Sequence, residues 1–190
     1  MKNQTHTCPW QGGSLLANPI RKVMHNPRRI LAPFLTDGMT AMDIGCGMGY
    51  FSIPMSGLVG DGKVIAVDLQ PEMLEGLKRR ASKKTCDNIF PHQCKTESLC
   101  LGEWEGKVDF ALVFWMLHEV PDSHRLIREI FTALKDNGKL LFVEPKGHVH
   151  AEDFEKSLEM IKATGFKKIS SLKIAFSRSV LLEKTKQGWR

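Results

Sequence analysis

Short apolar segments rich in β-branched residues alternate with amphipathic helical patterns from residue 40 to residue 183. Apolar runs cover residues 40–44, 63–68, 89–94, 108–114 and 139–144, and residues 167–173 and 179–183 are the last strand candidates. Parallel strands joined by crossover helices produce this alternation, because each helix returns the chain to the edge where the strands begin. The pattern therefore predicts one α/β domain with helices on both faces of a mainly parallel sheet.

One of these segments, Val108–Phe114, is apolar at almost every position, which is typical of a central strand buried on both faces. Pro71 opens a predicted helix, since proline suits the first turn. A second helix is expected over Ser123–Leu134, where the turn residues Asp136–Gly138 stop it before the next strand. A third amphipathic helix is expected over Ala151–Thr164.

The chain has 190 residues, of which 42% are hydrophobic and 25% are charged. These values fit one globular domain. Residues 1–35 lie outside the alternation and are interpreted as an N-terminal helical or cap segment of the same domain, which otherwise covers residues 36–190. The five cysteines form no C-x-x-C pair, the N-terminus lacks a signal sequence, and no apolar run is long enough to span a membrane. We therefore expect a soluble, cytoplasmic protein with no membrane partner.

The formal net charge is +6. Basic residues gather in the N-terminal segment and near residues 78–84, and such clusters can follow a phosphate backbone. No aromatic platform lies between these charges, so solvated helix faces are the favoured explanation. Nucleic acid remains a partner to test.

A glycine cluster follows the first predicted strand and reads Asp43-Ile-Gly-Cys-Gly-Met-Gly-Tyr50. Glycine adopts positive φ without strain and has no Cβ, so backbone N–H groups can approach a ligand closely. Asp68 ends the next strand, 19 residues after Gly49, where a carboxylate can accept both hydroxyls of a ribose. The two features predict a nucleoside site at the carboxyl ends of the strands.

Two common nucleotide-binding patterns are absent from this cluster. The dinucleotide fingerprint G-x-G-x-x-G needs glycine where Tyr50 stands, and no Gly-Lys-Ser/Thr follows as in a P-loop. Asp43 would repel a pyrophosphate and attract a cationic ligand. The cluster therefore disfavours NAD.

The segments Asp43–Gly49 and Val64–Asp68 resemble the first two motifs of class I S-adenosylmethionine (SAM)-dependent methyltransferases. Val108–Val120 resembles the strand-four motif of the small-molecule branch, and Leu134–Glu144 resembles the motif that leads into strand five. The resemblance covers roughly residues 30–185. It implies a Rossmann-like, doubly wound sheet of seven strands with an antiparallel last strand, and methyl transfer (EC 2.1.1.-) from SAM that leaves S-adenosylhomocysteine.

The resemblance also implies which residues bind the cofactor. The three loop glycines would line its amino-acid part, Asp43 would face its ammonium group, Asp68 would bind the ribose and Leu69 would lie beside the adenine. Lys95 stands where the family often has an acidic residue, so Glu97 or a backbone carbonyl would have to contact the adenine amino group. The aromatic residues could face the sulfonium or simply belong to the core. The expected cofactor site comprises Asp43, Gly45, Cys46, Gly47, Gly49, Tyr50, Asp68, Leu69, Glu97 and Trp115.

Candidate catalytic residues follow strands four and five. His118 could act as a general base oriented by Glu119 or by Glu144, because histidine titrates near neutral pH. Alternatively, His118 packs or caps locally. His148 and His150 are interpreted as surface residues, so no metal site is predicted.

The function we expect is methyl transfer to a small molecule. The alternatives are an RNA methyltransferase and a SAM-binding protein without catalysis. Enzymes that methylate base amino groups typically carry Asn or Asp and two prolines after strand four, where this chain has Phe114–Leu117. The N-terminal segment with Trp10 is the expected cover of the acceptor site, so deleting residues 1–25 should harm turnover more than cofactor binding.

Overall fold

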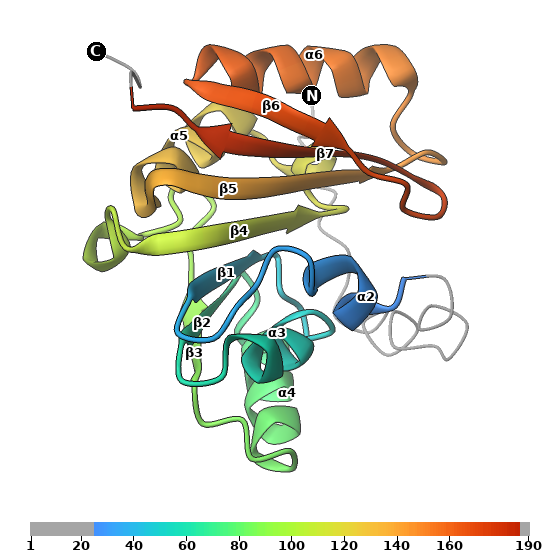
Figure 1. The fold of residues 1–190 in the computed structure, drawn as a ribbon. Coiled ribbons are helices and arrows are strands. Elements are labelled where there is room, and N and C mark those ends of the chain that lie inside the picture. The colour runs from blue at the N-terminus through green and yellow to red at the C-terminus, as the bar shows by residue number, and fades with distance from the viewer. Residues whose placement is uncertain (1–24, 187–190) are drawn as a thin grey trace.

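The computed structural model describes residues 25–186, and within them one seven-stranded sheet carries helices on both faces (Figure 1). The strand order is β3-β2-β1-β4-β5-β7-β6. Strands β1 to β5 pair in parallel, whereas β7 is antiparallel to both of its neighbours. The predicted Rossmann-like sheet with an antiparallel last strand is therefore confirmed. The strands are β1 (Thr40–Ile44), β2 (Lys63–Asp68), β3 (Ile89–Gln93), β4 (Val108–Phe114), β5 (Leu134–Pro145), β6 (Phe166–Ser171) and β7 (Ser177–Lys184).

The helices divide between the two faces of the sheet, and each set covers one apolar cluster. Helices α5 and α6 pack on one face, and α2, α3 and α4 pack on the other. Their bounds are α2 (Pro27–Leu31), α3 (Ser52–Val59), α4 (Pro71–Ser82), α5 (Ser123–Ala133) and α6 (Ala151–Ala163), and the 3₁₀ turns are η3 (Gly102–Trp104) and η4 (Leu117–Glu119).

Strand β4 shows why the sheet needs both layers. Ala111 and Val113 belong to the cluster under α5 and α6, whereas Phe110, Leu112 and Phe114 belong to the cluster under α2, α3 and α4. All five side chains are buried. Because successive side chains in a strand point to opposite faces, an apolar run without alternation must be covered twice. The prediction of a central strand is confirmed, since β4 lies between β1 and β5.

The turn predicted at Asp136–Gly138 is wrong. Helix α5 ends at Ala133, and β5 already begins at Leu134, which has an extended backbone. The pairing of β5 with β4 is irregular between Val108 and Phe110, and Asn137 has a φ of 63°. Asparagine tolerates the left-handed region, so these residues form an irregularity inside the strand instead of a loop before it. The other predicted bounds differ by a few residues at the ends of elements.

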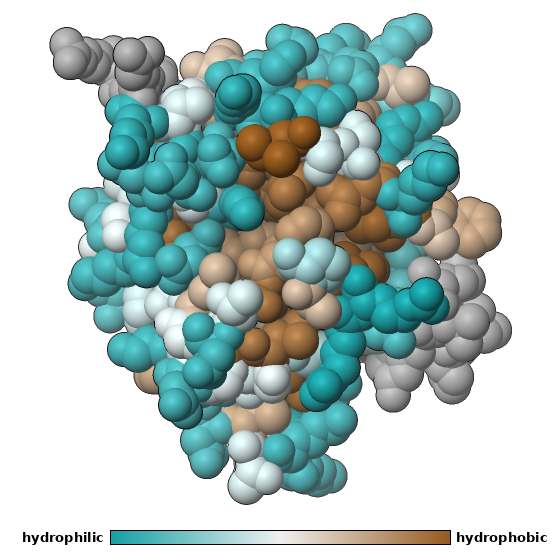
Figure 2. Space-filling model, in the orientation of Figure 1, coloured by the Kyte–Doolittle hydropathy of each residue, from teal (hydrophilic) through white to brown (hydrophobic). Residues whose placement is uncertain are grey.

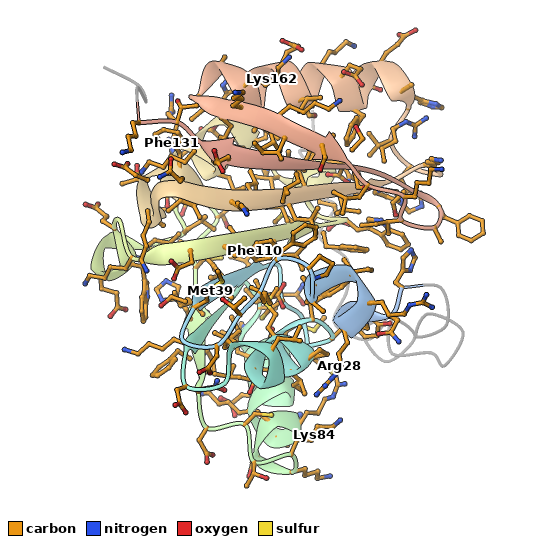
Figure 3. The ribbon with its side chains drawn as sticks, viewed as in Figure 1. Arg28, Met39, Lys84, Phe110, Phe131 and Lys162 are labelled. Atoms are coloured by element: carbon orange, nitrogen blue, oxygen red, sulfur yellow. The ribbon has the colours of Figure 1, made fainter. Side chains whose placement is uncertain are left out.

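Apolar residues fill the middle of the face shown in Figure 2, and hydrophilic residues surround them. Charged residues occur in several places: Arg28 and Lys84 line one pocket, whereas Lys162 lies on α6 at the far side of the sheet (Figure 3). Within residues 25–186 no helix is long and apolar enough to cross a membrane. Of the predicted N-terminal segment, residues 1–24 with Trp10 lie outside the described residues.

Candidate cofactor and acceptor site

The glycine loop lies at the carboxyl end of β1, beside the end of β2. The backbone N–H groups of Gly45 and Cys46 both donate to the carbonyl of Val67, over 2.9 and 3.0 Å. Gly45, Gly47 and Gly49 have φ values of +70°, +52° and +78°. Only glycine adopts this left-handed conformation readily, so the three glycines give the loop its path.

The three glycines differ in what a side chain would meet. A Cβ on Gly49 would lie 2.2 Å from Leu77 Cδ1, so this glycine allows α4 to pack against the loop. A Cβ on Gly45 would lie 3.2 Å from Met116 Cγ, whereas a Cβ on Gly47 would meet nothing within 4 Å. The open side of the loop is therefore at Gly47, where a ligand can approach the backbone.

Asp68 borders this open side. Its Oδ2 accepts a hydrogen bond from Gly47 N over 2.8 Å, and its Oδ1 accepts one from Gln70 N over 2.9 Å. Burial raises the pKa of Asp68, although these backbone hydrogen bonds oppose the shift. Each carboxylate oxygen can accept a second hydrogen bond. The geometry therefore fits the two hydroxyls of a ribose.

Asp43 and Cys46 lie on the inner side of the loop. Asp43 is buried and accepts a hydrogen bond from Ser52 Oγ over 2.5 Å. Burial raises the pKa of the Cys46 thiol well above its usual range, and the carboxylates of Asp43 and Asp68 add to the shift. Burial also raises the pKa of Cys94, to about 11. Both cysteines are therefore neutral thiols at physiological pH.

The expected adenine side is formed by the chain after β3. Cys94 N donates to the carbonyl of Asp68 over 3.0 Å, and a tight turn follows in which Lys95 N donates to Ser98 O. Leu69 is partly buried beside Asp68, but Glu97 is exposed. The carbonyl of Glu97 accepts a hydrogen bond from Arg125. The turn thus lies beside Asp68, and the described contacts of Glu97 involve its backbone.

Tyr50 and Trp115 both contact His25, which lies in the N-terminal segment and belongs to none of the sequence motifs. Tyr50 Oη donates to the carbonyl of His25 over 3.0 Å, and the ring centroids of His25 and Trp115 lie 4.8 Å apart, edge to face. Trp115 has a φ of 59° and donates from Nε1 to Ser177 Oγ. Nothing in the local sequence indicates that His25 is only 1% exposed.

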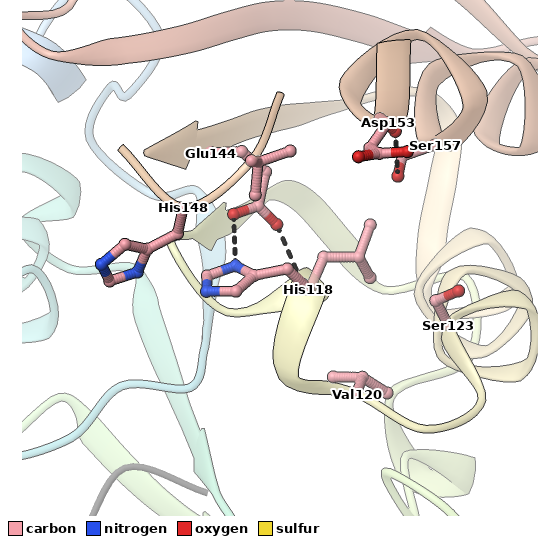
Figure 4. Close-up of a pocket in the computed structure, with 9 residues that line it drawn as sticks. His118, Val120, Ser123, Glu144, His148, Asp153 and Ser157 are labelled. Carbon is pink, nitrogen blue, oxygen red and sulfur yellow. Dashed lines mark hydrogen bonds and ion pairs between the residues drawn. The ribbon is translucent and has the colours of Figure 1, made fainter. Parts of the chain in front are cut away.

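His118 and Glu144 form a hydrogen-bonded pair at the carboxyl ends of β4 and β5 (Figure 4). His118 Nδ1 lies 2.7 Å from Glu144 Oε2, and His118 N donates to Glu144 Oε1 over 3.1 Å. Glu119 Oε1 is 4.0 Å from His118 Nε2. Of the two carboxylates considered from the sequence, Glu144 is therefore the one that orients the imidazole.

The pair is asymmetric in burial. The side chain of Glu144 is 3% exposed, whereas that of His118 is 24% exposed. Burial raises the pKa of Glu144, and the nearby His118 opposes this shift. A carboxylate that accepts from Nδ1–H leaves Nε2 as the acceptor of the ring. The arrangement can hold a proton on Nε2 and stabilise the resulting imidazolium.

A pocket of about 280 Å³ adjoins this pair. His148 lies beside His118, with their ring centroids 5.9 Å apart, and Figure 4 shows both rings pointing away from Ser123 and Val120. The pocket mixes apolar and polar side chains, and its size suits a compact ligand. It is lined by Leu117, His118, Val120, Ser123, Glu144, His148, Val149, Asp153 and Ser157.

The known proteins that this chain resembles are methyltransferases. A family model described as a methyltransferase domain matches residues 35–187. A demethylmenaquinone methyltransferase of Lactococcus lactis is 29% identical over 122 residues, which are 62% of this chain and 48% of that protein. A ubiquinone/menaquinone biosynthesis C-methyltransferase of Shewanella sediminis is 31% identical over 109 residues, or 56% of this chain and 43% of that protein. This chain thus spans about half the length of the curated relatives that it matches.

Among solved structures, a SAM-dependent methyltransferase from Aquifex aeolicus has a TM-score of 0.83 at 22% identity. The match covers 93% of this chain and 99% of the other. At this identity the likeness shows a shared fold.

Proposed function

Because this chain belongs to the methyltransferase-domain family, we propose that it transfers a methyl group from SAM to a small-molecule acceptor whose proton passes to His118. The observation that carries the proposal is the His118–Glu144 pair, with 2.7 Å between Nδ1 and Oε2. Strand β4, which ends just before His118, is hydrogen-bonded to β1, which ends at the glycine loop. Donor site and base therefore lie on neighbouring strands.

The residues of the loop fit the cofactor. Asp68 would accept the ribose hydroxyls, the open backbone at Gly47 would approach the amino-acid part, and buried Asp43 supplies negative charge for the ammonium group. SAM, when bound, supplies an electrophilic methyl group on a positively charged sulfur. The chain contributes binding, orientation and exclusion of water.

His118 would take the proton of the acceptor on Nε2, while Glu144 holds Nδ1–H and stabilises the imidazolium. With a reduced quinone, loss of the hydroxyl proton makes the adjacent ring carbon nucleophilic, and this carbon bonds to the methyl carbon as the carbon–sulfur bond breaks and the sulfur keeps the electron pair. Loss of the proton on that ring carbon then restores the aromatic ring. We propose acceptors that carry an acidic hydroxyl, such as reduced quinones. The names of the two curated relatives support this class.

The proposal is tested by separating binding from turnover. In calorimetry, SAM should bind and NAD should not, and Asp68→Ala should weaken SAM binding on the order of 100-fold, because two hydrogen bonds to a carboxylate are lost. The exposed Asp87→Ala is the matched control. In assays with reduced demethylmenaquinone, His118→Ala should lower kcat on the order of 100-fold with SAM affinity unchanged.

Two results would contradict this proposal. One is equal SAM affinity in the Asp68→Ala and Asp87→Ala variants. The other is methylation of RNA in preference to the quinol, with binding that weakens steeply as salt rises, as counterion release requires.

A further inference from the structure

Phe176 combines two features that do not favour the stability of an isolated protein. It is 66% exposed, more than the other exposed large apolar residues of the described chain, Phe90 (41%) and Ile169 (47%). Its backbone φ is 53°, a left-handed conformation that a bulky side chain adopts only at a cost. Glycine would remove both the strain and the exposed ring. A strained outlier of this kind indicates a role outside folding.

The turn between β6 and β7 is held firmly in place. Ser177 N donates to Ile174 O over 3.2 Å, and Lys146 N donates to Phe176 O over 2.9 Å. The carbonyl of Ala175 accepts from His25 Nε2 over 2.7 Å and from Ser177 Oγ over 3.0 Å. Hydrogen bonds within the turn, from the backbone of Lys146 and from the ring of His25 therefore hold the backbone that carries the exposed ring.

The two loops at Phe176 are basic, and the acidic residues Glu152 and Asp153 come only after them, in the first turn of α6. Residues 172–178 and 146–150 contain no Asp or Glu, and they carry Lys146, Lys173 and Arg178. The two loops are joined, since Arg178 Nη1 donates to Val149 O over 2.8 Å. Figure 1 shows both loops extending beyond the same end of the sheet. An apolar ring thus stands among cations at one edge of the molecule.

We propose that the β6–β7 turn and the β5–α6 loop dock on an anionic lipid bilayer, with Phe176 in the headgroup region. An aromatic ring gains by entering the membrane interface, and each lysine or arginine near an anionic surface strengthens attachment about fivefold. This is contact with the surface of a membrane and needs no spanning helix. The earlier expectation of no membrane partner, which rested on the absence of apolar runs, does not address such contact.

Docking in this position would serve the reaction. His148, from the same β5–α6 loop, lines the pocket beside His118. The pocket would open next to the bilayer, so an apolar acceptor dissolved there could enter without crossing water. This consequence rests on the proposed function, whereas the docking itself does not.

Co-sedimentation with lipid vesicles tests the docking. The protein should bind vesicles that contain phosphatidylserine on the order of 100-fold more strongly than vesicles of phosphatidylcholine alone, since three cations contribute about fivefold each. Phe176→Gly should lose most of this binding without a lower melting temperature, because glycine relieves the backbone strain. The double variant Lys146→Glu/Lys173→Glu should lose the preference for phosphatidylserine.

The matched control is Phe90→Thr, which removes another exposed ring from β3 and should bind as the wild type does. Two results with vesicles would overturn the inference: no binding of the wild type to phosphatidylserine vesicles, or equal binding by the wild type and Phe176→Gly. A third would be displacement of the vesicles by an oligoribonucleotide that the wild type and Phe176→Gly bind equally well. Vesicle binding needs neither SAM nor an acceptor, so its failure would leave the proposed methyl transfer intact.

Discussion

Glu144 is a carboxyl group that the fold keeps almost entirely from water. Its two oxygens accept from the backbone N–H and the ring of His118, and burial still raises its pKa. A charged group in such a place costs folding free energy unless it is fully compensated. Under the proposed function, Glu144 would lower the stability of the fold in exchange for orienting His118.

Replacing this residue should separate the two effects. A carboxyl with a raised folded pKa contributes most to stability below its unfolded pKa, and that contribution is lost as pH rises through the folded pKa. Glu144→Gln does not titrate. The wild type should therefore lose stability relative to the variant as pH rises above the ordinary pKa range of a glutamate, measured by urea unfolding, while the variant loses kcat on the order of 100-fold.

The exposed Glu119→Gln is the control for that experiment, because Glu119 lies farther from the imidazole. If the two variants showed the same dependence of stability on pH, burial would not be the reason for the shift in the pKa of Glu144.

At the scale of single residues, the sequence predicted which residues of the glycine loop lie together, but it did not predict contacts between distant elements. The glycine spacing and Asp68 led to the correct neighbours, because the loop geometry follows from local backbone preferences. The choice between Glu119 and Glu144 depended on how strands β4 and β5 pair. The burial of His25 against Trp115 joins residues 90 positions apart, and no local pattern encodes such a contact.

The side chain of Asn88 forms four hydrogen bonds that connect neighbouring elements. Its Nδ2 donates to the carbonyls of Ser56, Gly60 and Gly62, and its Oδ1 accepts from Ser56 Oγ. One side chain before β3 thus joins the end of α3 to the start of β2. It satisfies carbonyls that the helix end leaves without partners.

Asn88→Ala should lower the free energy of unfolding by about 2 to 4 kcal/mol, since several partly buried hydrogen bonds are lost at once. Denaturation in guanidinium chloride measures the change. The neighbouring and exposed Asp87→Ala should change it by less than about 0.5 kcal/mol. Equal effects of the two substitutions would show that Asn88 does not connect these elements.

At the scale of elements, periodicity predicted the seven strands and the helices α4, α5 and α6 well, because each apolar stripe has one face to cover. The prediction failed at Asp136–Gly138, where turn-forming residues lie within β5. The pairing with β4 and the burial of Leu134 outweigh the local preference there. Contacts with the rest of the sheet therefore determined the conformation of these residues.

At the scale of the whole molecule, the proposed donor and acceptor sites lie at the carboxyl ends of neighbouring parallel strands, and positive charge is spread over several helices. The N-terminal segment remains the candidate cover of the acceptor site. His25 belongs to the described part of that segment and contacts Tyr50, so a truncation that removes it would disturb the glycine loop directly.

A deletion of residues 1–24 that keeps His25 should therefore lower kcat/KM for a quinol acceptor on the order of tenfold through poorer exclusion of water. The affinity for SAM should stay within about twofold. Calorimetry and steady-state assays measure the two quantities, and deletion of residues 187–190 is the control at the other end. Unchanged turnover after the N-terminal deletion would rule out the cover.

The pairing of β1 with β4 also bears on how such a protein can diversify. The backbone hydrogen bonds between these two strands hold the proposed donor site and His118 in a fixed relative position. The amide hydrogens of this central part of the sheet should exchange slowest. The β5–α6 loop lies outside this part of the sheet and holds His148. Loop replacement could then change which acceptor is used while the donor site stays as it is, so substrate choice in this scaffold is a modular trait.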